Sequence, residues 1–150
     1  MSILDARSEF CDATTLNTGG AASYIIGDVY DTGATDPGDI GTGLGELYIV
    51  ITVDTTATSG GSATGTFSLV TDNNASLTSP AVLISSKAWA VADMIAGTVL
   101  LAAKLPIEGT PYERYIGIQQ TTGTAAFTAG KINAFLTKDV SRWSAYPDAI

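Results

Sequence analysis

The sequence lacks histidine altogether and holds a single cysteine among its 150 residues. Without histidine, the chain has neither the usual general base near neutral pH nor the commonest metal ligand. Ser–His–Asp and Cys–His catalysis are therefore excluded, and a zinc site would lack its usual ligands. Cys11 cannot form an internal disulfide, and we interpret it as a small buried hydrophobic residue.

Charged residues are also scarce, at 15% of the chain, and the balance of seven basic and fifteen acidic residues gives a net charge of −8. The basic residues are scattered singly, so the sequence offers no basic stripe for a phosphate backbone or an anionic membrane. We therefore expect no nucleic-acid partner and no membrane partner. An acidic surface is typical of a protein that faces open solvent or a basic partner.

Long apolar runs are missing as well, since no stretch is long enough to cross a bilayer or to act as a signal peptide. The glycine-rich run at 41–45 (GTGLG) precedes a predicted strand, whereas a dinucleotide fingerprint follows one. No spacing of acidic residues points to paired catalytic carboxylates. We therefore predict no catalytic residue, no bound cofactor and no enzyme activity.

Four aspartates (Asp28, Asp31, Asp36 and Asp39) lie in or beside the turn-rich segment at 31–45. Their spacing is not that of an EF-hand, which needs ligands at alternate positions and a closing glutamate. We interpret the segment as a solvated loop without a metal ion, and calcium binding is the alternative.

Alternating apolar and polar residues predict strands over most of the chain. The clearest is at 46–54 (ELYIVITVD), where both faces are apolar, which indicates a central strand or one buried beneath a partner. Residues 127–140 (FTAGKINAFLTKDV) predict the last strand, with Ile132, Ala134 and Leu136 on one face. Residues 98–105 (TVLLAAKL) predict a strand with Val99, Leu101, Ala103 and Leu105 on one face.

Further strands are expected at 21–30, 65–71, 81–85 and 114–121, which makes about seven, and no long helix is predicted. The segment at 87–97 is ambiguous, and we expect Trp89 and Met94 in it to fill the core. This spacing of short strands indicates an all-β, single-domain antiparallel β-sandwich. The pattern does not separate a jelly roll from an immunoglobulin-like sandwich. We assign residues 21–140 to the sandwich, 1–16 to an N-terminal arm that docks on a sheet or a neighbour, and 141–150 to a C-terminal arm. A short amphipathic helical turn is the alternative for the N-terminal segment.

Several runs, in the same order along the chain, carry a resemblance to a known family. They are ILDARSEFCDAT (3–14), DIGTGLGELYIVITVD (39–54), SLVTDNNASLTSP (68–80), KLPIEGTPYERYIGI (104–118) and the final run at 127–140. In these runs the chain resembles the capsid cement, or decoration, proteins of tailed phages, of the Bordetella-phage type. None of the runs is a catalytic motif.

The resemblance implies a jelly roll that is made in the host cytoplasm and binds the outside of an assembled phage capsid. It implies a structural virion protein that clamps neighbouring major capsid subunits, as a homodimer. We expect partner contacts at the two ends of the chain, where apolar and aromatic anchors are available. These residues are Ile3, Leu4, Phe10, Trp143, Tyr146 and Ile150. The alternative is that both ends cover the core of their own domain.

A second hypothesis is a carbohydrate-binding type of β-sandwich. Such a module needs aromatic side chains that face solvent beside polar groups. The candidates are Tyr24, Tyr30, Tyr48, Tyr112 and Tyr115, which are not clustered in the sequence.

Overall fold

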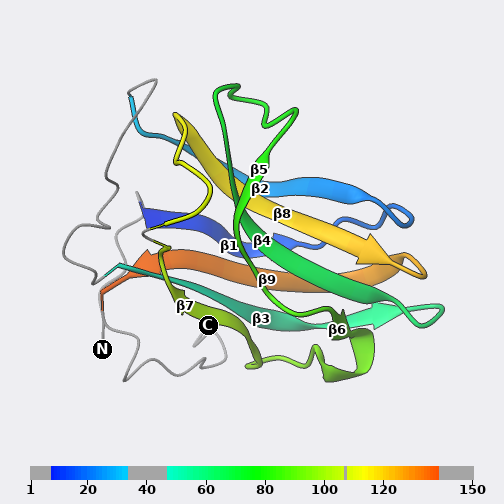
Figure 1. The fold of residues 1–150 in the computed structure, drawn as a ribbon. Helices are drawn as coiled ribbons and strands as arrows, with labels where there is room; N and C mark the ends of the chain where they lie inside the picture. The colour runs from blue at the N-terminus through cyan, green and yellow to red at the C-terminus, as the bar shows by residue number, and fades with distance from the viewer. Residues whose placement is uncertain (1–7, 34–46, 107, 139–150) are drawn as a thin grey trace.

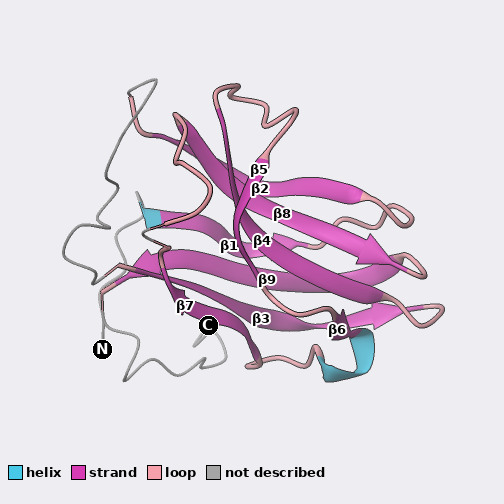
Figure 2. Cartoon of the chain, in the orientation of Figure 1, coloured by secondary structure: helices cyan, strands magenta, loops and turns pink. Residues whose placement is uncertain are grey.

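The computed structural model describes residues 8–33, 47–106 and 108–138. Within these residues the chain forms nine strands and no α-helix, as Figures 1 and 2 show. The strands are β1 (Glu9–Thr15), β2 (Ser23–Asp31), β3 (Tyr48–Ser59), β4 (Thr64–Asp72), β5 (Ala81–Ser85), β6 (Trp89–Ala90), β7 (Val99–Lys104), β8 (Tyr115–Gly123) and β9 (Phe127–Thr137), with a 3-10 turn, η2 (Val91–Asp93), before β7.

The strands form two antiparallel sheets that lie one above the other (Figure 1). The first sheet has the order β1-β9-β3-β7, and the second has the order β2-β8-β4-β5, with β6 also paired to β4. Successive strands mostly alternate between the sheets, whereas an immunoglobulin-like sandwich keeps several successive strands together. The predicted antiparallel β-sandwich is confirmed, and its strand order is that of a jelly roll.

The central strand of the first sheet is β3, between β9 and β7. Ile49, Ile51 and Val53 face the core, and Val50 and Thr52 on its other face are only 1% exposed. Apolar side chains on both faces are typical of a strand covered on both sides. The interpretation of 46–54 as a central strand is therefore confirmed.

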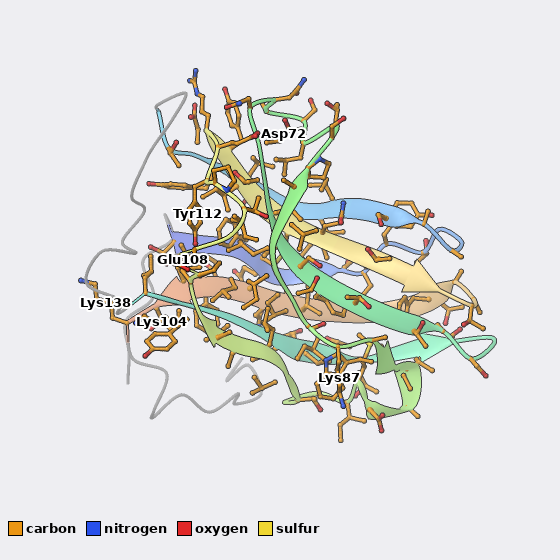
Figure 3. The ribbon with its side chains drawn as sticks, viewed as in Figure 1. Asp72, Lys87, Lys104, Glu108, Tyr112 and Lys138 are labelled. Carbon is orange, nitrogen blue, oxygen red and sulfur yellow. The ribbon has the colours of Figure 1, made fainter. Side chains whose placement is uncertain are left out.

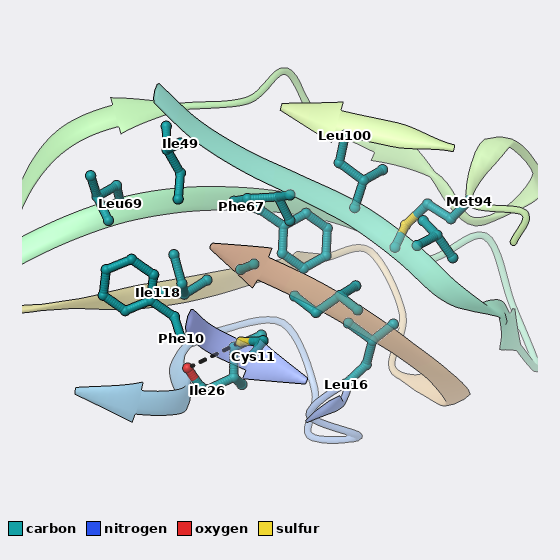
Figure 4. Packing of buried hydrophobic residues seen from close by; sticks show 14 of the residues in the cluster. Phe10, Cys11, Leu16, Ile26, Ile49, Phe67, Leu69, Met94, Leu100 and Ile118 are labelled. Atoms are coloured by element: carbon teal, nitrogen blue, oxygen red, sulfur yellow. Dashed lines mark hydrogen bonds between the residues drawn. The ribbon is translucent and has the colours of Figure 1, made fainter. Parts of the chain in front are cut away.

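The core lies between the two sheets and draws on both, as Figure 4 shows. Phe67 and Ile118 of the second sheet meet Ile49 and Ile132 of the first, and all four are completely buried. Each such side chain contributes about 1.5–3 kcal/mol by leaving water. Met94, just after η2, is also completely buried, which confirms its predicted place in the core, and Trp89 packs half-buried against the same cluster.

The predicted faces of the 98–105 strand are wrong at its start. Val99 is 40% exposed, and Leu100 is buried in the core at 4% exposure. The cause is a register irregularity against β3, where Ile51 pairs with Leu101 but Thr52 pairs with Val99. The extra residue, Leu100, turns inward and reverses the alternation, as a β-bulge does.

The expected N-terminal arm is described from residue 8 onward. Its residues Glu9–Thr15 form β1, which pairs with β9 at the edge of the first sheet. The linker that follows is pinned to the second sheet by Gln120, a residue with no exposed surface. The Gln120 side chain accepts a hydrogen bond from the Asn17 N–H (2.9 Å) and donates one to the Asn17 carbonyl oxygen (3.0 Å). The expected C-terminal arm, 141–150, lies outside the described residues.

Candidate partner-binding surface

The only cysteine is a core residue. Cys11 is 1% exposed, and its Sγ lies 3.9 Å from the carbonyl oxygen of Ile26 on β2 (Figure 4). Burial raises the pKa of the Cys11 thiol to about 12, so the thiol stays protonated at neutral pH. The thiolate is the reactive form, and the interpretation of Cys11 as a small buried hydrophobic residue is confirmed. Across residues 8–33, 47–106 and 108–138, no three acidic or cysteine side chains gather as a metal site would require.

A bidentate ion pair joins the end of β2 to the start of β8. Arg114 Nε lies 2.8 Å from Asp31 Oδ1, and Arg114 Nη2 lies 3.0 Å from Asp31 Oδ2. The hydrogen bond from Arg114, and then that from the Gly33 N–H, hold the pKa of the Asp31 carboxyl below its ordinary value. Asp31 thus binds Arg114. Asp36 and Asp39 of the calcium alternative lie outside the described residues.

A second carboxylate shapes the turn between β4 and β5. Asp72 accepts hydrogen bonds from the backbone N–H groups of Asn74 (3.1 Å) and Ser79 (2.9 Å). The turn carries Leu77, 3% exposed, over Gly117 of β8, where a Cβ would come within 2.6 Å of the Leu77 side chain. The segment at 72–80 therefore forms a closed turn that covers part of the outer face of the second sheet.

The outer face of the first sheet also holds buried apolar side chains. Val50 of β3 pairs with Phe135 of β9, and each is 1% exposed although neither belongs to the core cluster. At the end of this sheet, Lys104 and Thr137 both pair with Tyr48, and Lys138 follows directly. Figure 3 shows Lys104 and Lys138 at this end. The register thus brings two lysines to the same end of the sheet, which their separation in the sequence had hidden.

The structure places one of the six predicted partner residues. Phe10 lies on β1, is 3% exposed and belongs to the core, as Figure 4 shows. For this residue the structure agrees with the alternative that the end of the chain covers its own domain. Ile3, Leu4, Trp143, Tyr146 and Ile150 lie outside the described residues.

Four large apolar side chains are exposed among the described residues, and only Tyr30 among them was a predicted solvent-facing residue, as a carbohydrate-binding candidate. They are Tyr30 (43%), Val82 (44%), Ile95 (56%) and Val99 (40%). Single exposed apolar residues are common on protein surfaces, so exposure alone does not identify a binding site. Val82 lies on the edge strand β5, and Val99 lies on the edge strand β7.

The five tyrosines do not form one platform. Tyr24 packs against the core, and Tyr112 is part of it, with its hydroxyl donating to the Pro106 carbonyl oxygen (2.9 Å). Tyr115 lies beneath the Arg114 guanidinium, 5.1 Å from ring to cation, and Tyr48 sits in the other sheet. The carbohydrate-binding hypothesis therefore gains no support from their placement.

The comparisons with known proteins place the chain in a family. A family model described as Bbp16 matches residues 12–136, which include nearly all of the strands. No curated protein matches the sequence. No helix in the described part of the chain is long and apolar enough to span a membrane. With most of its length matched, the chain belongs to the Bbp16 family, a Bordetella phage-type family, and is a phage protein.

Proposed function

We propose that this protein is a capsid cement protein that binds the outside of the assembled phage head. It stabilises the shell by clamping neighbouring major capsid subunits, acts as a homodimer and has no enzyme activity. The observation that carries the proposal is the match to the Bbp16 family over residues 12–136. Neither nucleic acid nor a membrane is a partner in this proposal.

The physical logic is the addition of several contacts. A dimer that touches more than one shell subunit makes its second contact at a high effective concentration, so modest individual affinities multiply. The jelly roll suits this task because its two sheets share one closed core, which holds the contact surfaces in fixed positions. A net charge of −8 favours solubility before docking.

Co-sedimentation tests the proposal directly. Purified protein is mixed with mature heads stripped of it and, separately, with unexpanded precursor shells. We expect saturable binding to the mature heads and a higher melting temperature of the shell. Absence of binding to both kinds of shell would refute the proposal, and a glycan screen would then test the carbohydrate-binding alternative.

A truncation asks whether the end of the chain takes part. We predict that removal of residues 141–150 leaves a folded domain that no longer binds heads. Circular dichroism and thermal melting serve as the folding control. Undiminished binding by the folded, truncated protein would remove Trp143, Tyr146 and Ile150 from the contact surface.

A further inference from the structure

Four strands stand at sheet edges among the described residues: β1 and β7 in the first sheet, β2 and β5 in the second. An edge strand presents backbone N–H and C=O groups that another strand can pair with. Soluble proteins usually blunt such edges with bulges, charges or a covering group. The four edges of this protein differ in how well they are protected against pairing with another strand.

The β1 edge is irregular and charged. Its pairing with β9 shifts register on both sides of Cys11, and Ala13 has a left-handed φ of 44°. Glu9 and Asp12 add two carboxylates to this short strand. A flat incoming strand would find no continuous ladder to extend.

The β2 edge is broken in a similar way. Its register against β8 shifts between Ile26 and Tyr30, and Gly27 lies in that break with a φ of 74°. Asp28 and Asp31 carry negative charge on the same strand. Bulges of this kind bend a strand and end regular pairing.

The β7 edge is covered by a side chain from the other sheet. Trp89 of β6 donates its indole N–H to the carbonyl oxygen of Leu100 (3.0 Å), so this backbone acceptor on the edge strand is already in use. Lys104 adds a charge at the end of the strand. An incoming strand would therefore find this backbone acceptor already occupied.

Within residues 8–33, 47–106 and 108–138, the β5 edge has none of these protections except one register irregularity against β4. The chain carries no charged residue from 73 to 86, so β5 and both of its flanks are uncharged. Val82 is 44% exposed. The Ser86 N–H donates to the Phe67 carbonyl oxygen on β4, so the N–H of the preceding Ser85 points away from β4, toward the open side.

We propose that two copies of this chain associate through the free edge of β5, paired antiparallel across a two-fold axis. The inference deepens the homodimer of the proposed function and rests on it. A two-fold axis places the same strand opposite itself in the antiparallel sense, which makes the contact self-complementary. Two chains of net charge −8 repel one another, so an uncharged strip is the part of the surface where they can meet at least electrostatic cost.

Sedimentation equilibrium of the purified full chain tests this surface. We expect the wild type to have twice the mass of one chain. Val82→Lys, which places a positive charge on the contact strand of both copies, should weaken the dimer about tenfold. Val82→Thr, a neutral β-branched control of similar shape, should remain dimeric. Val82 is 44% exposed, so both variants are expected to fold, and thermal melting checks that they do.

A second variant addresses the backbone. Ser85→Pro removes an N–H on the open side of β5 and should also yield monomers. Amide exchange gives an independent readout, because protection of the Ser85 N–H should rise with protein concentration in the wild type.

Three results would overturn the inference. One is a wild type that stays monomeric at every concentration, and another is dimerisation retained by both Val82→Lys and Ser85→Pro. The third is a dimer that dissociates in neither variant while its binding to heads is lost in Val82→Lys, since β5 would then pair with the shell. Wild-type binding to heads is measured separately, so a failure of the cement proposal is distinguishable from a failure of this one.

Discussion

The outer edges of β7 and β5 show two different ways for a sheet to end. The β7 edge is closed by the β6–η2 segment, which anchors itself with the Met94 side chain and covers the Leu100 carbonyl with the Trp89 indole. The β5 edge follows the Asp72 turn, which covers the face of the sheet and leaves the edge itself open. One segment thus covers the edge of a sheet, whereas the other covers only a face. This difference is the reason why we propose β5, and not β7, as the strand through which two copies associate.

The largest expected effect comes from removing the anchor beside β7. Met94 is completely buried, and its carbonyl oxygen accepts a hydrogen bond from the Ala57 N–H (2.9 Å) on β3. Met94→Ala should lower the free energy of unfolding by about 2–5 kcal/mol, because it leaves a cavity in the core. Ile95→Ala, at a residue 56% exposed, should stay within about 0.5 kcal/mol of wild type. Equal effects of the two changes in urea unfolding would show that Met94 is not the anchor.

The next effect concerns the cover beside β5. In Gly117→Ala the new Cβ would lie 2.6 Å from Leu77 Cδ1, so the cover must shift. We expect a loss of about 1–3 kcal/mol of stability from this crowding. Gly20→Ala, where a Cβ meets nothing within 4 Å, is the matched control. The double variant with Leu77→Ala should recover part of the loss, and strict additivity would contradict the proposed contact.

Opening the β7 edge should have a smaller effect. Trp89→Phe keeps an aromatic ring for packing and for the Lys87 ammonium, which lies 4.0 Å from the ring centre, but removes the donor to Leu100. We expect a loss of about 0.5–1.5 kcal/mol, the usual net value of one hydrogen bond. Lys87→Gln, which removes the cation alone, is the control and should cost less. If Trp89→Phe unfolds at the same denaturant concentration as wild type, the indole does not secure this edge.

The smallest effect is the pH dependence of the Asp72 turn. The backbone N–H of Ser79, and after it that of Asn74, hold the pKa of the Asp72 carboxyl below its ordinary value. A carboxyl with a lowered folded pKa stabilises the fold fully above its unfolded pKa of about 3.9, and this contribution is lost as the pH falls through the folded pKa. The melting temperature of Asp72→Asn should therefore fall less than that of wild type between about pH 6 and pH 2.5. Asp31→Asn serves as the comparison, since the pKa of Asp31 is also lowered. Parallel curves for wild type and Asp72→Asn would contradict this role.

The sequence pattern predicted most strands, because alternation reports which strand face is buried. It succeeded at β3, where apolar residues on both faces marked a central strand, and at β9, where Ile132 and Ala134 are completely buried as expected. It failed at Val99 and Leu100, because a bulge depends on the register against β3, and alternation within one strand does not contain that register.

The sequence predicted much less of the candidate partner-binding surface than of the fold. The pairing of Arg114 with Asp31 spans 83 positions, and nothing in the run PYERYI selects that partner over another. The apolar and aromatic residues near the ends of the chain indicated partner contacts, but Phe10 is a core residue. The uncharged run at 73–86 was visible in the sequence, but its meaning required the knowledge that β5 is an edge strand.

Composition and two-residue alternation are local properties, so they were enough to predict the all-β class, the net negative charge and the absence of histidine chemistry. The strand order, the burial of Gln120 against the Asn17 backbone and the difference between the β5 and β7 edges are visible only in the folded chain. These features depend on which distant segments meet. Pairing between strands far apart in the chain is fixed by the packing of the whole core, since many strands of similar pattern could pair in other orders.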